Sequence, residues 1–130
     1  NTSVRFLSIS VGRAHSCGLG TDSIAYCWGA NDANQVGSGP DTCPGVSYGG
    51  CARSPTPVPG ASRFRALQTT GLGALADETT CGITRTDDLF CWGSNRYGQF
   101  GDGVTGSSSN PVTAAAPGLK LASLELGAQF

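Results

Sequence analysis

The sequence predicts an all-β fold made of β-propeller blades, each a four-stranded antiparallel sheet, and three observations lead to this prediction. The first is an internal repeat whose copies begin at Phe6, Phe64 and Leu121, 58 and 57 residues apart. The second is a series of short apolar runs separated by turns rich in glycine and proline. The third is that no window carries the i, i+3, i+4, i+7 apolar pattern of a helix. Helix should therefore be nearly absent.

The repeat divides the chain into two full copies, residues 6–63 and 64–120, and the opening of a third over 121–130. The phrase AYCWGAN at residues 25–31 returns as LFCWGSN at residues 89–95. So many matches in one register do not arise by chance, and they mark positions that both copies use in the same structural way. The matched positions are Trp28, Gly29, Asn31, Gln35, Gly37, Gly39 and Pro57-Val58 in the first copy, and Trp92, Gly93, Asn95, Gln99, Gly101, Gly103 and Pro111-Val112 in the second.

Each copy contains four expected strands, and repeated blades of this kind indicate a propeller. The strands are expected at residues 6–11, 15–19, 24–29 and 56–58, and again at 64–69, 79–83, 88–93 and 111–113. Two blades cannot close a ring, and their edges expose unpaired N–H and C=O groups. We therefore expect an open object, or one that neighbouring chains complete.

The order of motifs from Cys17 to Val58 resembles the repeat of the regulator of chromosome condensation family. The motifs are Cys-Gly-Leu, Tyr-Cys-Trp-Gly-x-Asn, Gln-x-Gly-x-Gly and Pro-Val, in the cysteine-bearing form of its secreted members. The resemblance covers almost the whole chain and implies β-propeller blades, usually seven. It also implies that His15 serves the blade interior. Two departures stand out: Gly12 and His15 have no counterpart in copy two, where residues 71–76 look like an insertion, and the chain holds only two repeats and a fragment.

Four of the six cysteines are expected to form two disulfides across hairpins. Cys17 and Cys27 flank a short turn, and Cys81 and Cys91 repeat this spacing. Directly opposed residues of an antiparallel pair have Cα atoms about 4.5–5.5 Å apart, within the range of a disulfide. Each bridge closes a short loop and contributes roughly 2.5–3 kcal/mol on the chain-entropy account.

The remaining cysteines, Cys43 and Cys51, lie in an insertion at residues 40–54 that copy two lacks. A disulfide between them would pin this loop, although free thiols stay open as an alternative. A zinc site is disfavoured because no Cys-x-x-Cys occurs. Paired cysteines require an oxidising compartment, so the sequence predicts a secreted or surface-exposed protein whose export signal has been removed.

Charge and hydropathy argue against two kinds of partner. The net charge is −1, and the eight Lys and Arg are scattered along the chain. We therefore expect no nucleic-acid partner. No apolar stretch reaches the roughly 20 residues that span a bilayer, so membrane insertion is not expected either.

The candidate catalytic groups are few. His15 is the only histidine, and no serine lies in a Gly-x-Ser-x-Gly motif on which a triad could be built. The acidic pairs Asp77-Glu78 and Asp87-Asp88 are expected in a loop and a hairpin turn, where they are merely solvated. The sequence therefore predicts no enzyme, no cofactor and no metal site.

The repeated residues are expected to be structural. The two tryptophans should pack in the blades, the glycines should take up positive φ in turns, and the asparagines should satisfy backbone groups there. Formal sites for sugar attachment are Asn1, in Asn-Thr-Ser, and Ser107 and Ser108, in a Ser- and Thr-rich stretch that is otherwise a solvated loop.

Two functional hypotheses follow. In the first, a structural or assembly protein self-associates: the strand at residues 121–127 of one chain completes a blade of the next by strand addition, and the contact repeats into a ring or a filament. In the second, the chain is a protein-binding or inhibitor module that acts through the face loops of a larger propeller. Carbohydrate binding stays open, without a supporting motif. The face loops are residues 40–54, 71–78 and 104–110.

Overall fold

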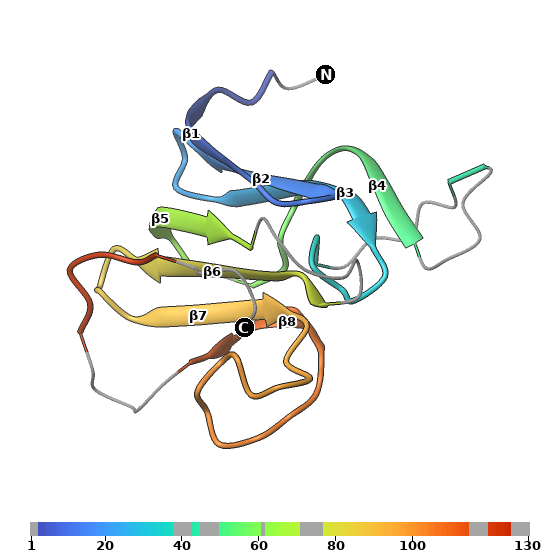
Figure 1. Ribbon diagram of the computed structural model, residues 1–130. Coiled ribbons are helices and arrows are strands. Elements are labelled where there is room, and N and C mark those ends of the chain that lie inside the picture. Colours follow the sequence, from blue (N-terminus) through green and yellow to red (C-terminus); the bar gives the residue numbers. More distant parts are fainter. Residues whose placement is uncertain are drawn as a thin grey trace.

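The computed structural model describes residues 3–37, 43–44, 50–60, 62–70, 77–114 and 120–125. Within these residues the chain forms eight strands and no α-helix, and the strands make two four-stranded antiparallel sheets (Figure 1). The described part therefore holds no helix that could cross a membrane. The all-β prediction is confirmed. The strands are β1 (Phe6–Val11), β2 (His15–Gly20), β3 (Ala25–Asn31), β4 (Gly50–Pro57), β5 (Phe64–Thr69), β6 (Thr79–Thr84), β7 (Leu89–Gly93) and β8 (Ser108–Thr113).

Each sheet is a simple meander in which strands that follow one another in the sequence are neighbours. We call the sheet β1-β2-β3-β4 blade 1 and the sheet β5-β6-β7-β8 blade 2. The β2–β3 hairpin turns through Ser23, whose φ is 67°, and the β6–β7 hairpin turns through Asp87, whose φ is 65°. Both hairpins thus use one residue in the left-handed region at the same place in the turn. The equal turns keep the two blades in the same register.

The disulfides join the cysteines that the hairpin spacing pairs. Cys17 lies directly opposite Cys27, and Cys81 lies opposite Cys91, with Cα atoms 4.1 Å apart in both pairs. The third disulfide links Cys43 to Cys51. All six cysteines are therefore paired.

The fourth strand of blade 1 is longer than predicted. It was expected at residues 56–58, but β4 begins at Gly50, which pairs with Asn31. Residues 50–54, assigned from sequence to the insertion, are therefore part of the sheet. The reason is that β3 continues to Asn31, two residues beyond its expected end, and offers β4 further backbone partners.

The register also corrects one match between the copies. Pro57 pairs with Tyr26, and Thr113 pairs with the equivalent Phe90. Pro57 therefore corresponds to Thr113 and not to Pro111. The two Pro-Val dipeptides are equivalent in composition but not in position.

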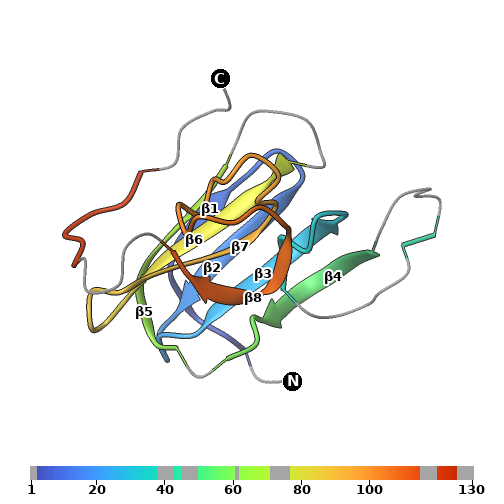
Figure 2. The same cartoon turned by 90° about the horizontal axis from the view of Figure 1, so that it is seen from below.

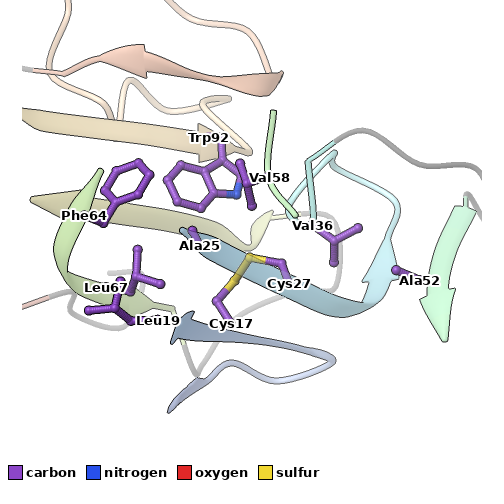
Figure 3. Close-up of a cluster of buried hydrophobic side chains, with 10 residues drawn as sticks. All are labelled: Cys17, Leu19, Ala25, Cys27, Val36, Ala52, Val58, Phe64, Leu67 and Trp92. Atoms are coloured by element: carbon purple, nitrogen blue, oxygen red, sulfur yellow. A yellow bond between two sulfur atoms is a disulfide. The ribbon is translucent and has the colours of Figure 1, made fainter. Parts of the chain in front are cut away.

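The two blades pack face to face through their first strands and diverge toward their fourth strands. β1 and β2 lie against β5, whereas β4 extends away from blade 2 (Figures 1 and 2). The main apolar core fills the space between the sheets (Figure 3). Burial of each large aliphatic or aromatic side chain there contributes roughly 1.5–3 kcal/mol. Its buried members are Cys17, Leu19, Ala25, Cys27, Val36, Ala52 and Val58 from blade 1 or the segments that flank its strands, and Phe64, Leu67 and Trp92 from blade 2.

Residues 120–125 open the third copy and lie against blade 2. The Leu121 N–H donates to the Asp87 carbonyl at 3.2 Å, which repeats the bond from the Phe64 N–H to the Ser23 carbonyl at 2.8 Å. Leu124 packs on the cluster around the Cys81–Cys91 disulfide. The predicted strand is not formed over the described residues 120–125, and 126–130 lie outside the described residues.

Candidate functional site, an open blade face

The repeat allows the faces of the two blades to be compared position by position. In a strand, alternate side chains point to opposite faces of the sheet. One face of blade 2 lies against blade 1, and we call it the covered face; the equivalent face of blade 1 points away from blade 2, and we call it the open face. The covered face includes Phe64, Leu67, Thr69, Thr80 and Trp92, and their equivalents on the open face are Phe6, Ile9, Val11, Ser16 and Trp28.

The covered face is sealed by blade 1. Trp92 has no exposed surface, and its ring lies 5.7 Å from that of Phe64 between their centroids. The Trp92 Nε1–H donates to the main-chain carbonyl of Gln35 at 3.1 Å, and the Thr80 hydroxyl donates to the same oxygen at 3.2 Å. Two hydrogen bonds to the Gln35 carbonyl thus hold the turn at residues 34–37 of blade 1 against the covered face.

The open face has the same chemistry without a cover. Phe6 and Trp28 have ring centroids 5.7 Å apart, as Phe64 and Trp92 do. Ile9 and Val11 of β1 are 55% and 67% exposed, whereas their equivalents Leu67 and Thr69 are buried. A stripe of apolar side chains on an edge strand is costly to leave in water and marks an interaction surface.

Beside Trp28 the open face is hollowed into a groove of about 410 Å³. Trp28, Gly29 and Ala30 of β3 form one side, Ala52 and Arg53 of β4 another, and the Cys43–Cys51 disulfide a third. The lining is mainly apolar, with the Asp32 and Arg53 side chains as its charged groups.

A buried polar cluster connects the two blades. His15 of β2 places Nδ1 3.0 Å from Glu78 Oε2 and Nε2 2.9 Å from Thr80 Oγ1. Glu78 also accepts from the Ala14 N–H at 2.8 Å and from Gln35 Nε2 at 3.2 Å. A carboxylate can only accept, so His15 Nδ1–H donates to Glu78, and Thr80 Oγ1 is the partner of Nε2.

The position of Glu78 corrects the expectation that Asp77-Glu78 is a solvated pair. Glu78 is only 3% exposed, and the Asp77 side chain is also buried, with its Oδ1 3.6 Å from Arg96 Nη1. Burial raises the pKa of Glu78, but hydrogen bonds from His15 and from the Ala14 N–H more than offset this, so the pKa lies below its ordinary value. Glu78 therefore ties blade 2 to blade 1 as an anion.

Thr80, His15 and Glu78 have the outline of a hydroxyl–base–carboxylate triad. A nucleophile of that kind needs access to a substrate and a free hydroxyl proton. Here all three side chains are buried, and the Thr80 hydroxyl is committed to the Gln35 carbonyl. The cluster is therefore built as an interblade clamp. Among the described residues, no group of three or more His, Cys, Asp or Glu side chains is placed to hold a metal ion.

The turn after the third strand of each blade is built in the same way. Asn31 Oδ1 accepts from the Val36 N–H at 3.1 Å, and Asn95 Oδ1 accepts from the Phe100 N–H at 2.9 Å. Gln35 and Gln99 accept from the main-chain N–H two residues before them, each at 2.8 Å. The two turns differ in cover: Gln35 is fully buried against blade 2, whereas Gln99 is exposed.

The other predicted positions divide between turns and surface. Positive φ is found at Gly29, Gly37, Gly93, Gly101 and Gly103. At Gly93 a Cβ would lie 2.6 Å from the Glu78 carbonyl oxygen, so this position also requires the absence of a side chain. Ser107 is exposed, and Ser108 begins β8. Gly39 and Asn1 lie outside the described residues.

Fold and site together define a protein of the β-propeller repeat class. The sequence profile described as Regulator of chromosome condensation (RCC1) repeat matches residues 6–35 and 77–99. The E3 ubiquitin-protein ligase HERC2 of Homo sapiens is 28% identical over 117 residues, which cover 88% of this chain and 2% of that protein. Over these residues the chain is similar to the repeats of the regulator of chromosome condensation family.

Solved structures agree on the fold. The crystal structure of Prp20p from Saccharomyces cerevisiae, a protein described with its binding to Gsp1p and histones, has a TM-score of 0.71 at 19% identity and covers 90% of this chain. Human WBSCR16 has a TM-score of 0.67 at 18% identity and covers 92%. This chain spans 27% of the length of each of those two chains.

Proposed function

We propose that the chain is a protein-binding module whose interaction surface is the open face of blade 1, and that it associates with further blades of its own kind. The observation that carries this is the equivalence of the open and covered faces. Ile9 and Val11 occupy the positions that Leu67 and Thr69 bury against blade 1. The covered face of blade 2 is buried by blade 1, whereas the equivalent open face of blade 1 leaves apolar side chains exposed for a partner to bury.

Association through such a face is head-to-tail, because the surface that receives a blade differs from the surface that is received. Contacts of this kind give a ring if the rotation closes and a filament if it does not. In the relative Prp20p, binding to the proteins Gsp1p and histones is likewise described, which favours protein binding over catalysis for this chain.

We further propose that the protein works in an oxidising compartment, secreted or at a cell surface, and without catalysis. Three disulfides among six cysteines support the first part. Mass spectrometry of native material after thiol alkylation tests it: no cysteine should be modified. Six modified cysteines would contradict the proposed compartment.

Binding through face loops is the weaker alternative. Of the loop at 71–78, the described residues Asp77 and Glu78 are buried and already engaged with other parts of the chain. Of the loop at 104–110, the last three residues belong to β8. The face of blade 1, in contrast, has no cover within the described part of the chain.

Sedimentation velocity over a range of concentrations tests the proposal. The weight-average mass should rise above 13.2 kDa as concentration increases. The double substitution Ile9→Ser with Val11→Ser should reduce this association while leaving the folded monomer intact, because both side chains are exposed in a single chain. A strictly monomeric wild-type protein up to about 1 mM would refute self-association.

A further inference from the structure

We infer that the groove beside Trp28 is the docking site for the turn at residues 95–101 of a second copy of this chain. The inference rests on the proposed function, and it names the contact by which two copies meet. Blade 1 and blade 2 already make this contact within one chain, so its geometry is visible in the structure.

The intramolecular contact supplies the template. The turn at residues 31–37 of blade 1 rests on Trp92, and the Gln35 Cα lies 3.2 Å from where a Cβ on Gly93 would be. At its end, a Cβ on Gly37 would lie 3.5 Å from the Ser109 carbonyl of β8. The turn thus crosses the end of β7 and reaches β8.

The groove has the same walls at equivalent positions. Trp28 and Gly29 correspond to Trp92 and Gly93, and Arg53 of β4 corresponds to Ser109 of β8. Ala30, which lines the groove, corresponds to Ser94, which is buried. The groove is therefore the counterpart of the seat that the turn of blade 1 fills on blade 2.

The hydrogen-bond donors of the seat are also present. On blade 2, the Trp92 Nε1–H and the Thr80 hydroxyl converge on the Gln35 carbonyl. On blade 1 their equivalents are the Trp28 Nε1–H and the Ser16 hydroxyl, for which the described residues supply no hydrogen-bond partner. Trp28 lines the groove and Ser16 is its register partner on β2, so two donors of matching chemistry lie at the equivalent positions.

The matching occupant is preformed on the same chain. The turn at residues 95–101 has the internal hydrogen bonds of the turn at 31–37, and its Gln99 is exposed. In the contact between copies, the Gln99 carbonyl accepts from Trp28 Nε1–H and from the Ser16 hydroxyl. A preformed turn loses little conformational entropy on binding, which favours association.

The contact between copies also avoids burying an unpaired charge. In the contact between copies, Thr79 of the copy that supplies the turn takes the place of His15. Ala14 of the copy that supplies the groove takes the place of Glu78. Thr79 already donates its hydroxyl hydrogen to the Ser94 carbonyl at 2.7 Å. Both partners of the ion pair are absent together, so docking leaves neither of them buried without its partner.

One segment competes with the incoming copy. Leu124 is equivalent to Ile9 and packs on the face of blade 2 that the second copy's β1 would approach. Residues 120–125 must therefore give way for the second copy to dock. We expect Leu124→Ser, which loosens this segment, to tighten association several-fold.

The test is sedimentation of four full-length proteins. Ala30→Arg fills the groove and should abolish association, whereas Thr21→Arg, the same residue placed on the exposed hairpin tip of blade 1, should leave it unchanged. Trp28→Phe keeps an aromatic ring and removes one donor, so the dissociation constant should rise about 3- to 10-fold. Circular dichroism with thermal unfolding checks that each variant is folded.

The outcomes separate this inference from the proposed function. If wild type associates and Ala30→Arg associates equally well, the groove contact is refuted, while association through the open face stands. If Ile9→Ser with Val11→Ser weakens association and Ala30→Arg does so as well, both are supported. If the wild-type chain stays monomeric, both are refuted.

Discussion

Trp28 and Trp92 occupy equivalent positions in their blades, and each packs against the equivalent phenylalanine, Phe6 or Phe64. Yet only Trp92 is fully buried. The difference lies in what covers them: blade 1 lies on Trp92, and no described residue of the chain lies on Trp28 in that way. The comparison shows that a propeller blade is stabilised as much by its neighbours as by its own sheet. It also shows that an uncovered blade face is a ready-made interaction surface.

The largest expected effect is a contrast between the two tryptophans. Trp92→Ala should lower the free energy of unfolding by about 3–5 kcal/mol, because it leaves a cavity in the core and the Gln35 carbonyl loses a donor. Trp28→Ala, at a half-buried site, should cost clearly less. Urea unfolding followed by circular dichroism at a concentration that keeps the chain monomeric measures both. Equal losses would mean that the two faces do not differ in cover.

The first strands of the two blades provide a second contrast. Leu67→Ala should cost about 2–4 kcal/mol, because Leu67 is buried between the sheets. Its counterpart Ile9→Ala should change the free energy of unfolding by less than about 0.5 kcal/mol, because Ile9 is exposed. Thermal unfolding of the pair measures the contrast, with Ile9→Ala serving as the matched control. A large loss from Ile9→Ala in dilute solution would contradict the open face.

The interblade clamp should give a smaller but specific effect. Glu78→Gln keeps the size of the side chain and removes its charge, so His15 Nδ1 loses its carboxylate partner. We expect a loss of about 1–3 kcal/mol at pH 7. The control is Asp102→Gln, a carboxylate on the turn after β7 that takes no part in the clamp. Equal stability of Glu78→Gln and wild type would show that the clamp does not stabilise the blades.

The same carboxylate should set part of the acid response. The pKa of Glu78 is lower in the folded chain than its ordinary value, so its contribution is complete above the unfolded pKa of about 4.3 and is lost as the pH falls through the folded pKa. Wild type should therefore lose stability below about pH 4.3 more steeply than Glu78→Gln. Urea unfolding at a series of pH values measures the slopes, and parallel slopes would contradict the assignment.

The strands and disulfides were predictable from the sequence because both follow from local spacing. Cys17 and Cys27 flank a turn that sets the register of their hairpin, and the copy at Cys81 and Cys91 repeats it. β4 was misplaced because an insertion separates it from β3, and spacing no longer indicates register across a loop. The match of Pro57 to Pro111 failed for the same reason.

The clamp was missed because its partners lie far apart in the sequence. His15 and Glu78 are separated by 63 residues, and a pair of acidic residues in a loop is ordinarily solvated. One signal was present: copy one reads Ala14-His15 where copy two reads Glu78-Thr79. The histidine and the carboxylate each occur where the other copy has an uncharged residue. This pattern is expected when one face of the first blade contacts the opposite face of the second, so that each blade supplies one partner.

The open face itself became visible only by superposing the copies in the structure. The sequence places Ile9 and Val11 in an expected strand, as it does their equivalents Leu67 and Thr69, and does not distinguish the two strands by exposure. Whether a face is covered depends on what lies next to its blade, and no property of β1 alone determines this. The exposed side chains on β1 therefore carry information about partners that the repeat pattern does not.

The most direct test of the central claim is the fluorescence of Trp28 as the only tryptophan, in a Trp92→Phe variant. If a second copy covers the open face, the emission maximum should shift to shorter wavelength as the concentration rises, in step with the mass measured by sedimentation, and the shift should vanish when Ala30→Arg is added. An emission maximum that stays constant while the mass increases would contradict the account, because association would then occur elsewhere on the molecule.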